Sequence, residues 1–459
     1  MIDLDEPRRV HIVGVGGAGM SAIATVLAAM GHHVSGSDLK ASAGLERLRA
    51  LGVTVTVGHD AANVGAADLV TVSTAVPPSN PELVAATERG IVVVRRAEML
   101  ASIASARRTI AIAGTHGKTT TTSMVALVLR TAGFDPSFVI GGDVNEIGGG
   151  AAWSASDWFV VEADESDGTF LELPAEVAVV TSVEADHLDH YGTAAAIESA
   201  FATFLRQASK RIVCADDVVA ARLGAETGAV TYGTAPTAEY HIDDITIERA
   251  RTSFTVTRHG ERVAEVVLPI PGAHNARNAT AALAVALELG AAVEPVVEAL
   301  GRFGGVARRF QFRGEAGGVT VVDDYAHNPG KVRAVLEAAR HGGWGRVVCV
   351  FQPHLYSRTA AQGCELGAAL ADADVVVVTD VYGARENPQP GVTGMIVATA
   401  AIDVRPWRRL AYLPKRADIV AYLREVLRPG DLCLTLGAGD VTSLADDLLP
   451  MLAARSSAR

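Results

Sequence analysis

Residues 114–120, Gly-Thr-His-Gly-Lys-Thr-Thr, combine the side chains and the backbone freedom that bind nucleotide phosphates. Gly114 and Gly117 allow the chain to turn tightly and to approach a ligand closely. N–H groups at the start of the following helix lack partners within the helix and point toward the same place. Lys118 adds a positive charge, and the hydroxyl of Thr119 is placed to bind Mg²⁺. The segment therefore predicts a phosphate-binding loop.

The alternative is a glycine-rich turn with an incidental lysine. The strict motif has a glycine where this chain has Ile112, so the match is to a shorter form. Lysine is rare, however: it occurs only at positions 40, 118, 210, 331 and 415. All the other residues in the combined count of Lys and Arg are arginines. Because a compact ammonium suits a phosphate better than a planar guanidinium does, its use at position 118 favours the loop.

Apolar segments on both sides position this loop. Thr109–Ala113 is short, apolar and β-branched, which predicts a buried strand, and the apolar residues 124–129 predict a helix. Two later strands, predicted at 158–161 and 177–181, lead into the acid-rich segments 162–167 and 184–190. Carboxyl ends of parallel strands share one edge of a sheet, so these two acid-rich segments are expected near the phosphates, where carboxylate and imidazole side chains can hold Mg²⁺. Solvated acidic loops are the alternative, although bound ATP would be repelled by them without an intervening metal ion.

A second glycine turn lies near the N-terminus. Val10–Val13 predicts a strand, Gly14-Val-Gly-Gly-Ala-Gly follows it, a helix extends to Met30, and Asp38 ends the next strand. This pattern places a pyrophosphate on the helix start. NAD and a nucleotide-sugar diphosphate both carry that group, so the pattern alone leaves both open.

The remaining segments lie between residue 239 and residue 440. Residues 239–270 alternate in polarity and predict antiparallel strands with a turn at His259-Gly260. Asn275 and Asn278 precede a helix predicted at 279–289, where capping is favoured over contact with a purine. Residues 304–318 are glycine-rich and basic, which predicts a linker or hinge. Beyond them, polar strand ends at 323–329 and 352–358 suggest a ligand site, and 437–440 fits either an anion nest or a plain tight turn.

Composition limits the classes of protein. The 459 residues are 49% hydrophobic and 20% charged with a net charge of −12, which argues against a nucleic-acid partner. The four cysteines, at 214, 349, 364 and 433, lack the paired spacing of metal ligands, so we expect four buried or inert thiols in a reducing cytoplasm. The acidic N-terminus is unlike a signal peptide, and no apolar run reaches about 18 residues, so no membrane insertion is expected. The fold class is α/β in three domains: an N-terminal Rossmann-like domain at 1–106, a central P-loop-type ATPase domain at 107–312, and a C-terminal Rossmann-like domain at 313–459.

Taken in order, these motifs resemble the Mur ligases of peptidoglycan synthesis over nearly the whole chain. The residues that carry the resemblance are 14–21, 114–120, 162–167, 184–190, 274–278, 323–329 and 352–358. The resemblance implies that domain 1–106 binds a UDP-sugar, that domain 107–312 binds ATP, and that the C-terminal domain binds the amino acid and closes on ATP.

The resemblance also implies roles for individual residues. Lys118, His187, His327 and Arg358 would act in catalysis, and Thr119, Glu162 and His187 would hold Mg²⁺. ATP would contact Gly114, Thr115, His116, Gly117, Lys118, Thr119, Thr120, Asn275, Asn278, Arg309, Asp324 and Tyr325. The UDP-sugar would contact Gly14, Gly16, Gly17, Ala18, Gly19, Met20, Ser21, Asp38 and Ser73. The amino acid would contact His327, His354 and Arg358, where Arg358 as a surface residue opening a helix is the alternative.

The implied reaction joins L-alanine to the lactyl carboxylate of UDP-N-acetylmuramate through an acyl phosphate, with ATP and Mg²⁺, in the cytoplasm, by a monomer or homodimer. Two departures bear on the branch of the family. Leu355 stands where some relatives have arginine, and no lysine lies at 191–209, where several sister ligases use a carbamylated one. The alternatives are a ligase that recycles murein peptides onto the same sugar nucleotide, an NAD-dependent oxidoreductase, and a nucleotide-gated regulatory protein.

Overall fold

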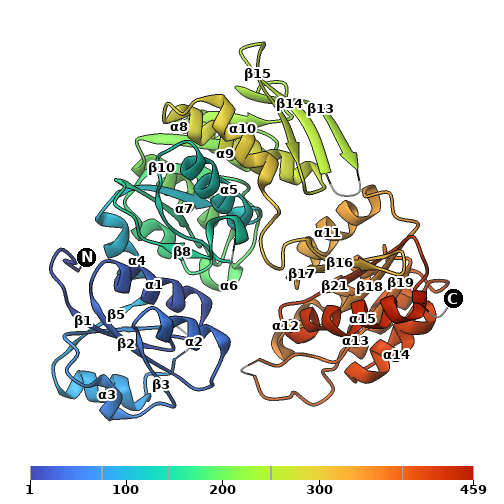
Figure 1. The fold of residues 1–459 in the computed structure, drawn as a ribbon, viewed down its shortest axis with the longest axis horizontal. Coiled ribbons are helices and arrows are strands. Elements are labelled where there is room, and N and C mark those ends of the chain that lie inside the picture. Colours follow the sequence, from blue (N-terminus) through green and yellow to red (C-terminus); the bar gives the residue numbers. More distant parts are fainter. Residues whose placement is uncertain (1, 74–75, 143, 249–250, 385, 458–459) are drawn as a thin grey trace. The chain divides into compact units, whose positions relative to one another are not determined.

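The computed structural model describes residues 2–73, 76–142, 144–248, 251–384 and 386–457. Within that part of the chain, the strands form three sheets, and the elements can be followed in Figure 1. The chain divides into two compact units, which are described separately below. The first comprises Met1–Ile245, Ser253–Leu268 and His274–Gly304, and the second comprises Thr246–Thr252, Pro269–Ala273 and Gly305–Arg459.

The N-terminal sheet is parallel, with the strand order β3-β2-β1-β4-β5. The order reverses beside β1, and in such sheets the crevice at that switch point takes the ligand. Its strands are β1 (Arg9–Val13), β2 (His33–Asp38), β3 (Thr54–Val57), β4 (Leu69–Val72) and β5 (Val92–Arg95). Its helices are α1 (Ala18–Ala29), α2 (Ala43–Ala50), η1 (Ala61–Val64), α3 (Pro81–Glu88) and α4 (Arg96–Ser105).

The central sheet has the order β15-β14-β13-β12-β11-β10-β6-β9-β7-β8, and its middle strands are parallel. The strands are β6 (Arg108–Ala113), β7 (Ser137–Val139), β8 (Ala151–Ala152), β9 (Trp158–Glu162), β10 (Ala175–Val180), β11 (Lys210–Cys214), β12 (Val230–Gly233), β13 (Tyr240–Glu248), β14 (Arg251–Arg258) and β15 (Glu261–Leu268). The helices are α5 (Lys118–Thr131), η2 (Asn145–Ile147), η3 (Thr169–Glu172), α6 (Leu188–Tyr191), α7 (Ala194–Gln207), α8 (Val218–Thr227), α9 (Ala273–Glu288) and α10 (Val293–Arg302).

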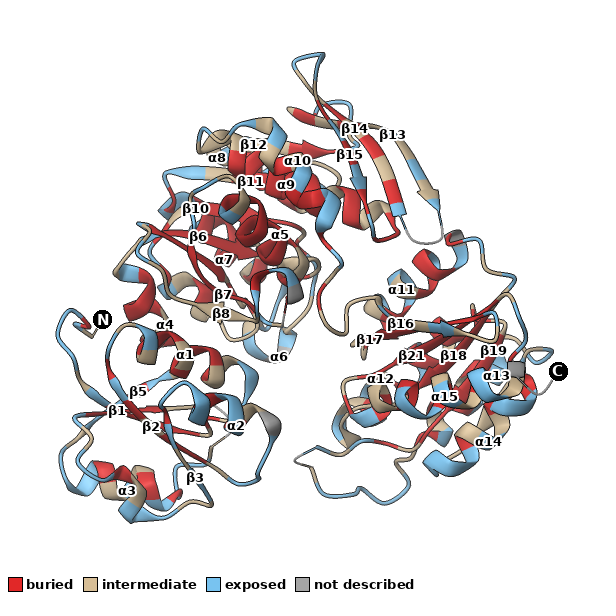
Figure 2. Cartoon of the chain, viewed as in Figure 1, coloured by how far each residue is buried: buried red, intermediate tan, exposed pale blue. Residues whose placement is uncertain are grey.

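One apolar core joins the N-terminal and central sheets of the first unit. It includes Ile12 from β1, Met99 from α4 and Ala111 from β6, all fully buried. Figure 2 shows inner strands of these sheets, such as β1 and β6, coloured mostly as buried, with exposed residues on the outer faces of helices. The core fixes the strand ends that precede both glycine turns.

The third sheet, in the second unit, has the order β16-β17-β21-β18-β19-β20 and is parallel except for β16. Different helices cover its two faces: α11 to α13 contribute to one apolar cluster, and α14 and α15 contribute to the other. The strands are β16 (Gln311–Ala316), β17 (Val319–Asp324), β18 (Arg346–Phe351), β19 (Val375–Val378), β20 (Arg409–Tyr412) and β21 (Asp431–Leu436). The helices are α11 (Pro329–His341), α12 (Tyr356–Leu370), α13 (Met395–Val404), α14 (Arg416–Val426), η4 (Asp440–Ser443) and α15 (Leu444–Ser457).

The predicted fold class is confirmed, and so is the hairpin turn at His259-Gly260. Both of its residues have positive φ, 53° and 81°, as a two-residue hairpin turn requires. The prediction of a linker over 304–318 is wrong in its second half, because β16 pairs with β17 there. Glycines at 314, 317 and 318 hid that strand. The predicted domain boundary at 312/313 lies inside β16, and the last segment of the second compact unit begins at Gly305.

Among the described residues, no helix is long and apolar enough to cross a membrane. The described cysteines are all free, and three of them, Cys214, Cys349 and Cys433, are buried.

Candidate nucleotide and substrate site

The phosphate loop links β6 to α5 at the carboxyl edge of the central sheet. Gly114 and Gly117 have φ values of 135° and 80°, in the left-handed region that favours glycine. Gly117 precedes α5, and no side chain caps that helix. A Cβ at Gly117 would lie 2.7 Å from Oδ1 of Asn278, so a side chain has no room there. The loop thus presents the uncapped N–H groups of a helix start, as predicted.

The second acidic strand end holds this loop in place. The backbone N–H of Thr115 donates to the carbonyl of Ser182 (3.0 Å), and the N–H of His116 donates to Oγ of Ser182 (3.0 Å). In return, the N–H of Glu184 donates to Oγ1 of Thr115 (2.9 Å). His116 Nε2 lies 3.1 Å from the Glu184 carboxylate, and this contact lowers the pKa of Glu184. Thr120 lies in the first turn of α5 and is partly exposed.

Lys118 is fixed by two acceptors. Its Nζ donates to the carbonyl oxygen of Gly114 (2.6 Å) and to Oε1 of Glu165 (2.7 Å). Glu165 is only 3% exposed, and its burial raises the pKa of the carboxyl, against the opposing effect of Lys118. The hydroxyl of Tyr191 donates to the carbonyl of Glu165 (2.6 Å), and burial raises the pKa of Tyr191 to about 12. The sequence analysis did not single out Glu165, because an acid inside an acidic run carries no distinguishing pattern.

Two of the three predicted magnesium ligands lie together. Oγ1 of Thr119 is 2.9 Å from Oε1 of Glu162, and Oε2 of Glu162 accepts from the N–H of Gly141 (2.8 Å). These are oxygen ligands of the kind that Mg²⁺ prefers, so the residues fit that ion. His187 has a positive φ of 54° and lies 3.8 Å from the Asp186 carboxylate. Among the described residues, no cluster of three or more His, Cys, Asp or Glu side chains could hold a metal ion, so the full ligand set stays a prediction.

The capping interpretation of Asn275 and Asn278 is wrong. Helix α9 begins at Ala273, so both residues lie inside it, and both are buried. Oδ1 of Asn278 accepts from Oγ1 of Thr121 on α5 (3.2 Å), which ties the two helices together beside Gly117. The alanine-rich stretch concealed this early start, because alanine, histidine and asparagine give no apolar periodicity. Contact of either asparagine with ATP stays a prediction.

Hydrogen bonds to the end of β2 hold the N-terminal glycine turn. The N–H groups of Gly14 and Val15 both donate to the carbonyl of Ser37 (2.9 and 3.0 Å), and Gly14 has a φ of 81°. The N–H of Gly16 donates to Oδ2 of Asp38 (2.9 Å), so Asp38 holds the turn. Helix α1 begins with Ala18, Gly19, Met20 and Ser21, and no side chain caps it at Gly17. Ser73 follows β4, the strand on the other side of β1 from β2.

Arg96, which the sequence analysis did not single out, lies between this turn and the acidic segment of the central domain. An added Cβ at Gly19 would lie 3.1 Å from its NH1, and its NH2 lies 3.8 Å from the Asp164 carboxylate. A single arginine at the start of α4 has no motif around it, so only the fold shows its position.

In the second unit, Asp324 shapes the predicted nucleotide contacts. It is buried, and its two oxygens accept from the N–H groups of Phe310 and Ala326 (both 2.7 Å). Burial raises the pKa of Asp324, and Arg309 acts in the opposite direction. The Arg309 guanidinium lies 5.5 Å from the centre of the Tyr325 ring. These three predicted residues therefore lie together in this unit.

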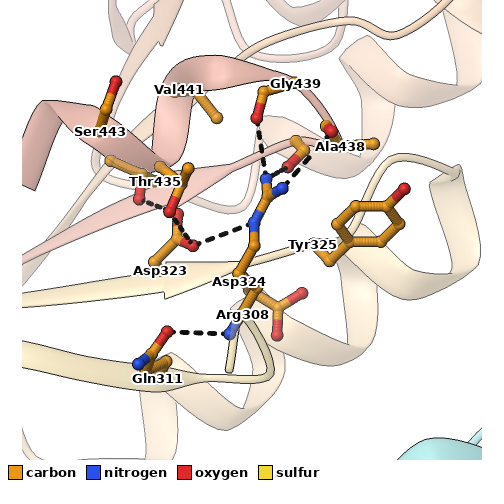
Figure 3. A network of polar contacts seen from close by, with 12 residues as sticks. Arg308, Gln311, Asp323, Asp324, Tyr325, Thr435, Ala438, Gly439, Val441 and Ser443 are labelled. Carbon is orange, nitrogen blue, oxygen red and sulfur yellow. Dashed lines mark hydrogen bonds and ion pairs between the residues drawn. The ribbon is translucent and has the colours of Figure 1, made fainter. Parts of the chain in front are cut away.

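Arg308 anchors the segment that carries Arg309 (Figure 3). Its guanidinium donates to the carbonyls of Gly437 and Gly439 and lies 3.4 Å from the Asp323 carboxylate. Asp323 is completely buried and accepts from Thr435 and Thr442 (2.6 and 2.7 Å). The loop at 437–440, read from the sequence as an anion nest or a turn, thus supplies carbonyl acceptors to an arginine.

His327, His354 and Arg358 also come together. The His327 and His354 rings are 5.9 Å apart, and NH1 of Arg358 lies 3.2 Å from Nδ1 of His354. Nδ1 of His327 lies 2.9 Å from the carbonyl of Tyr325. Burial, with Lys331, Arg358 and His354 nearby, lowers the pKa of His327 to about 3, against the opposing Tyr325 carbonyl. The ring of Tyr382, which the sequence analysis did not identify, stacks on His354 with an interplanar angle of 15°.

Leu355, the departure noted in the sequence, has an unusual backbone. Its φ of 69° lies in the left-handed region, and it immediately precedes α12. Backbone strain of this kind clusters at ligand sites. The N–H of Leu355 donates to the carbonyl of Tyr382 (3.0 Å), and the N–H of Tyr382 donates to the carbonyl of Pro353 (2.8 Å). These two bonds fix the segment that carries His354.

Parallel sheets with glycine turns at the starts of α1 and α5 define a protein of the nucleotide-binding α/β class. Three models of one family match the chain in order: "Mur ligase family, catalytic domain" at residues 9–108, "Mur ligase middle domain" at 112–286, and "Mur ligase, glutamate ligase domain" at 308–439. The chain belongs to the Mur ligase family.

Individual relatives agree with that assignment. The UDP-N-acetylmuramate--L-alanine ligase of Kineococcus radiotolerans is 50% identical, with 97% of each chain covered, and that of Thermobifida fusca is 47% identical, with 98% of each covered. Among solved structures, the UDP-N-acetylmuramate-alanine ligase of Thermotoga maritima is 30% identical with a TM-score of 0.84, covering 98% of this chain and 100% of that one. A murein peptide ligase from Psychrobacter arcticus is 25% identical with a TM-score of 0.71, covering 97% and 99%.

Proposed function

We propose that this protein joins L-alanine to the lactyl carboxylate of UDP-N-acetylmuramate at the expense of ATP, in the synthesis of peptidoglycan precursors in the cytoplasm. The observation that carries the proposal is the phosphate loop, with Lys118 and Thr119 beside Glu162, in a chain 50% identical over nearly its full length to a ligase of that name. We assign UDP-sugar binding to residues 1–106, ATP binding to the central domain, and amino-acid binding to the C-terminal domain.

The first chemical step is phosphoryl transfer. The lactyl carboxylate attacks the γ-phosphorus of ATP, ADP leaves, and an acyl phosphate forms. Positioning and charge neutralisation provide most of the catalysis in such transfers. Lys118 has one N–H left after its bonds to Gly114 and Glu165, and that N–H donates to the transferring group. Thr119 and Glu162 would hold Mg²⁺, which supplies charge neutralisation on the phosphates when bound.

In the second step, the neutral amine of L-alanine attacks the acyl carbonyl and phosphate leaves. The two histidines of the second unit suit the two ends of an amino acid. Nδ1 of His327 faces a carbonyl and must donate to it, which leaves Nε2 as an acceptor for the amine. Nδ1 of His354 faces the Arg358 guanidinium and must accept from it, which leaves Nε2–H as a donor to the carboxylate.

An assay of phosphate release from ATP and UDP-N-acetylmuramate tests the proposal. L-alanine, L-serine, glycine and a murein tripeptide are compared at saturating ATP and Mg²⁺. We expect L-alanine to give the highest kcat/KM. A preference for the tripeptide would instead identify a ligase that recycles peptides, and absence of phosphate release with any acceptor would reject both.

Calorimetry on the whole chain tests the N-terminal assignment. UDP-N-acetylmuramate should bind, whereas NAD and NADP should produce no heat. The Gly16→Ala variant should lose this binding, because its Cβ would lie 2.7 Å from Oδ2 of Asp38. Micromolar binding of a dinucleotide would contradict the assignment.

A further inference from the structure

Among the described residues, the carboxylate of Glu165 is paired with one cation. Its Oε1 accepts from Nζ of Lys118 at 2.7 Å, whereas its Oε2 is buried and has no hydrogen-bond partner. The neighbouring Asp164 has other contacts, since it accepts from the N–H of Ser166 (3.2 Å) and lies 3.8 Å from Arg96. Lys118 is therefore the cation that compensates Glu165.

This burial makes separation of the pair costly. The Glu165 side chain is 4% exposed and the Lys118 side chain 15% exposed. Removing one partner from a buried ion pair leaves an uncompensated charge, which is strongly unfavourable. An ammonium has three N–H groups, and Lys118 uses two of them on Gly114 and Glu165. It can therefore reach a phosphate without leaving Glu165.

A lysine that keeps this partner brings no net charge to the phosphates. The surrounding residues add further negative charge, because Glu162, Asp164 and Glu184 lie at the same sheet edge as the loop. Attraction for a polyanion then depends on the N–H groups of α5 and on a bound divalent cation.

We propose that Glu165 is a positioning residue that holds the Lys118 ammonium in the loop throughout the reaction and cancels its net charge, which makes nucleotide binding depend on a divalent cation. This inference rests on the proposed function. The alternative is that Glu165 pairs with Lys118 only until ATP binds and displaces it.

The test measures ATP binding to the whole protein by calorimetry, once with Mg²⁺ and once with EDTA. Glu165→Gln keeps an acceptor for Nζ but removes the negative charge. We expect it to bind metal-free ATP at least about tenfold more tightly than the unmodified protein, since one charge is removed a few ångströms from the phosphates. Binding of Mg·ATP should change by less than about threefold, because the metal already neutralises the phosphates.

Glu165→Asp separates position from charge. It keeps the carboxylate but shortens the side chain by one bond, about 1.5 Å. Metal-free ATP should then bind as weakly as it does to the unmodified protein, while kcat falls by about 10²-fold, because Lys118 is displaced from its working position. This variant also shows the effect if Glu165→Gln folds poorly.

Glu176→Gln is the matched control. It makes the same change of charge on the same sheet, but Glu176 lies at the start of β10 in a surface ion pair with Arg108. Both ATP affinities should stay unchanged in this variant.

Two results would overturn the inference. If Glu165→Gln increases the affinities for metal-free ATP and for Mg·ATP equally, ATP displaces Glu165. If the affinity for metal-free ATP is unchanged in this variant, Glu165 does not control the charge of the site. Both presuppose that the unmodified protein binds Mg·ATP. If it does not, the proposed function fails, and this inference fails with it.

Discussion

Oγ1 of Thr119 lies 2.9 Å from Oε1 of Glu162, although 43 positions separate these residues in the sequence. They meet because β6 and β9 are parallel neighbours. Thr119 follows β6 and Glu162 ends β9, at the same edge of the sheet. A phosphate loop and a carboxylate therefore share one small volume. That arrangement suits a metal bound between protein and phosphates.

Replacement of Lys118 should greatly reduce turnover. Lys118→Ala removes a preorganised donor from the transferring phosphoryl group, so we expect kcat to fall by about 10²–10³-fold. Lys118→Arg should lower kcat nearly as much, because a planar guanidinium does not fit between Gly114 and Glu165. Phosphate release is measured at saturating Mg²⁺, with Lys210→Ala as the control, since Lys210 bonds a helix end at Glu288. Unimpaired turnover in either Lys118 variant would reject the assignment of the loop.

Gly117→Ala should impair ATP binding beyond the cost of backbone strain. At a φ of 80°, alanine costs about 1 kcal/mol, and its Cβ would also lie 2.7 Å from Oδ1 of Asn278. We expect the KM for ATP to rise at least about tenfold, since each tenfold loss needs only about 1.4 kcal/mol.

Gly290→Ala controls for strain alone. Gly290 has a φ of 86° in the same unit, and an added Cβ would meet nothing within 4 Å. This variant should lose stability without a change in the KM for ATP. If both variants shift the KM equally, strain explains the effect and the contact with Asn278 does not.

Glu82 should make the stability of the N-terminal domain depend on pH. It is completely buried on α3. Burial alone would raise its pKa, but hydrogen bonds from His11, Ser37 and Asn63 outweigh that effect and lower the pKa to about 2, from an ordinary value of 4.5. The unfolded chain then binds more protons than the folded chain between these values. Stability therefore rises with pH over that range, by roughly 3 kcal/mol in total.

Calorimetric unfolding of Glu82→Gln measures this contribution. The variant should unfold at a lower temperature than the unmodified protein at pH 7, and the difference should shrink as the pH falls from 4.5 toward 2. Glu46→Gln, which changes an exposed residue paired with Arg49, should match the unmodified protein. A destabilisation of Glu82→Gln that is the same at every pH would show that shape, and not charge, matters at this position.

The sequence predicted the features that depend on local pattern. Both glycine turns, the acidic strand ends and the polar ends of β17 and β18 lie where apolar strands meet breakers, and that pattern is visible in one dimension. Membership of the Mur ligase family is confirmed by models that match from residue 9 to residue 439. Residues such as Glu165, Arg96 and Tyr382 could not be predicted, because their partners are distant in sequence and no local pattern distinguishes them from their neighbours.

Two misread segments have a common cause. Helix α9 begins at Ala273, and β16 lies within glycine-rich sequence, so both elements are stabilised by tertiary contacts that override weak local signals. The same holds for Arg308, which resembles any surface arginine until β17 and the loop after β21 surround it. Thus the sequence indicates where the chemistry lies, and packing determines how its residues are held.

Arg358 should select the amino acid. NH1 of Arg358 lies 3.2 Å from Nδ1 of His354, in the first turn of α12, where a cation opposes the helix dipole. That placement has a cost, and binding of a carboxylate offsets it through two parallel charge-assisted hydrogen bonds. Arg358→Ala should therefore raise the KM for L-alanine by one to two decades, roughly 1.5–3 kcal/mol. The KM values for ATP and UDP-N-acetylmuramate should stay within a few-fold, because we assign the binding of their phosphates to the first unit.

Each substrate is varied in turn with the other two saturating, and Arg358→Lys and Arg333→Ala are measured alongside. Arg358→Lys keeps the charge but loses the planar guanidinium. Its KM for L-alanine should therefore lie between the values for the unmodified protein and for Arg358→Ala. Arg333 is exposed on α11 in the same unit, and its loss should leave all three constants unchanged. A common rise of the three KM values in Arg358→Ala would assign Arg358 to the architecture of the second unit. A rise in the KM for ATP alone would show that Arg358 does not contact the amino-acid carboxylate. That carboxylate would then bind elsewhere.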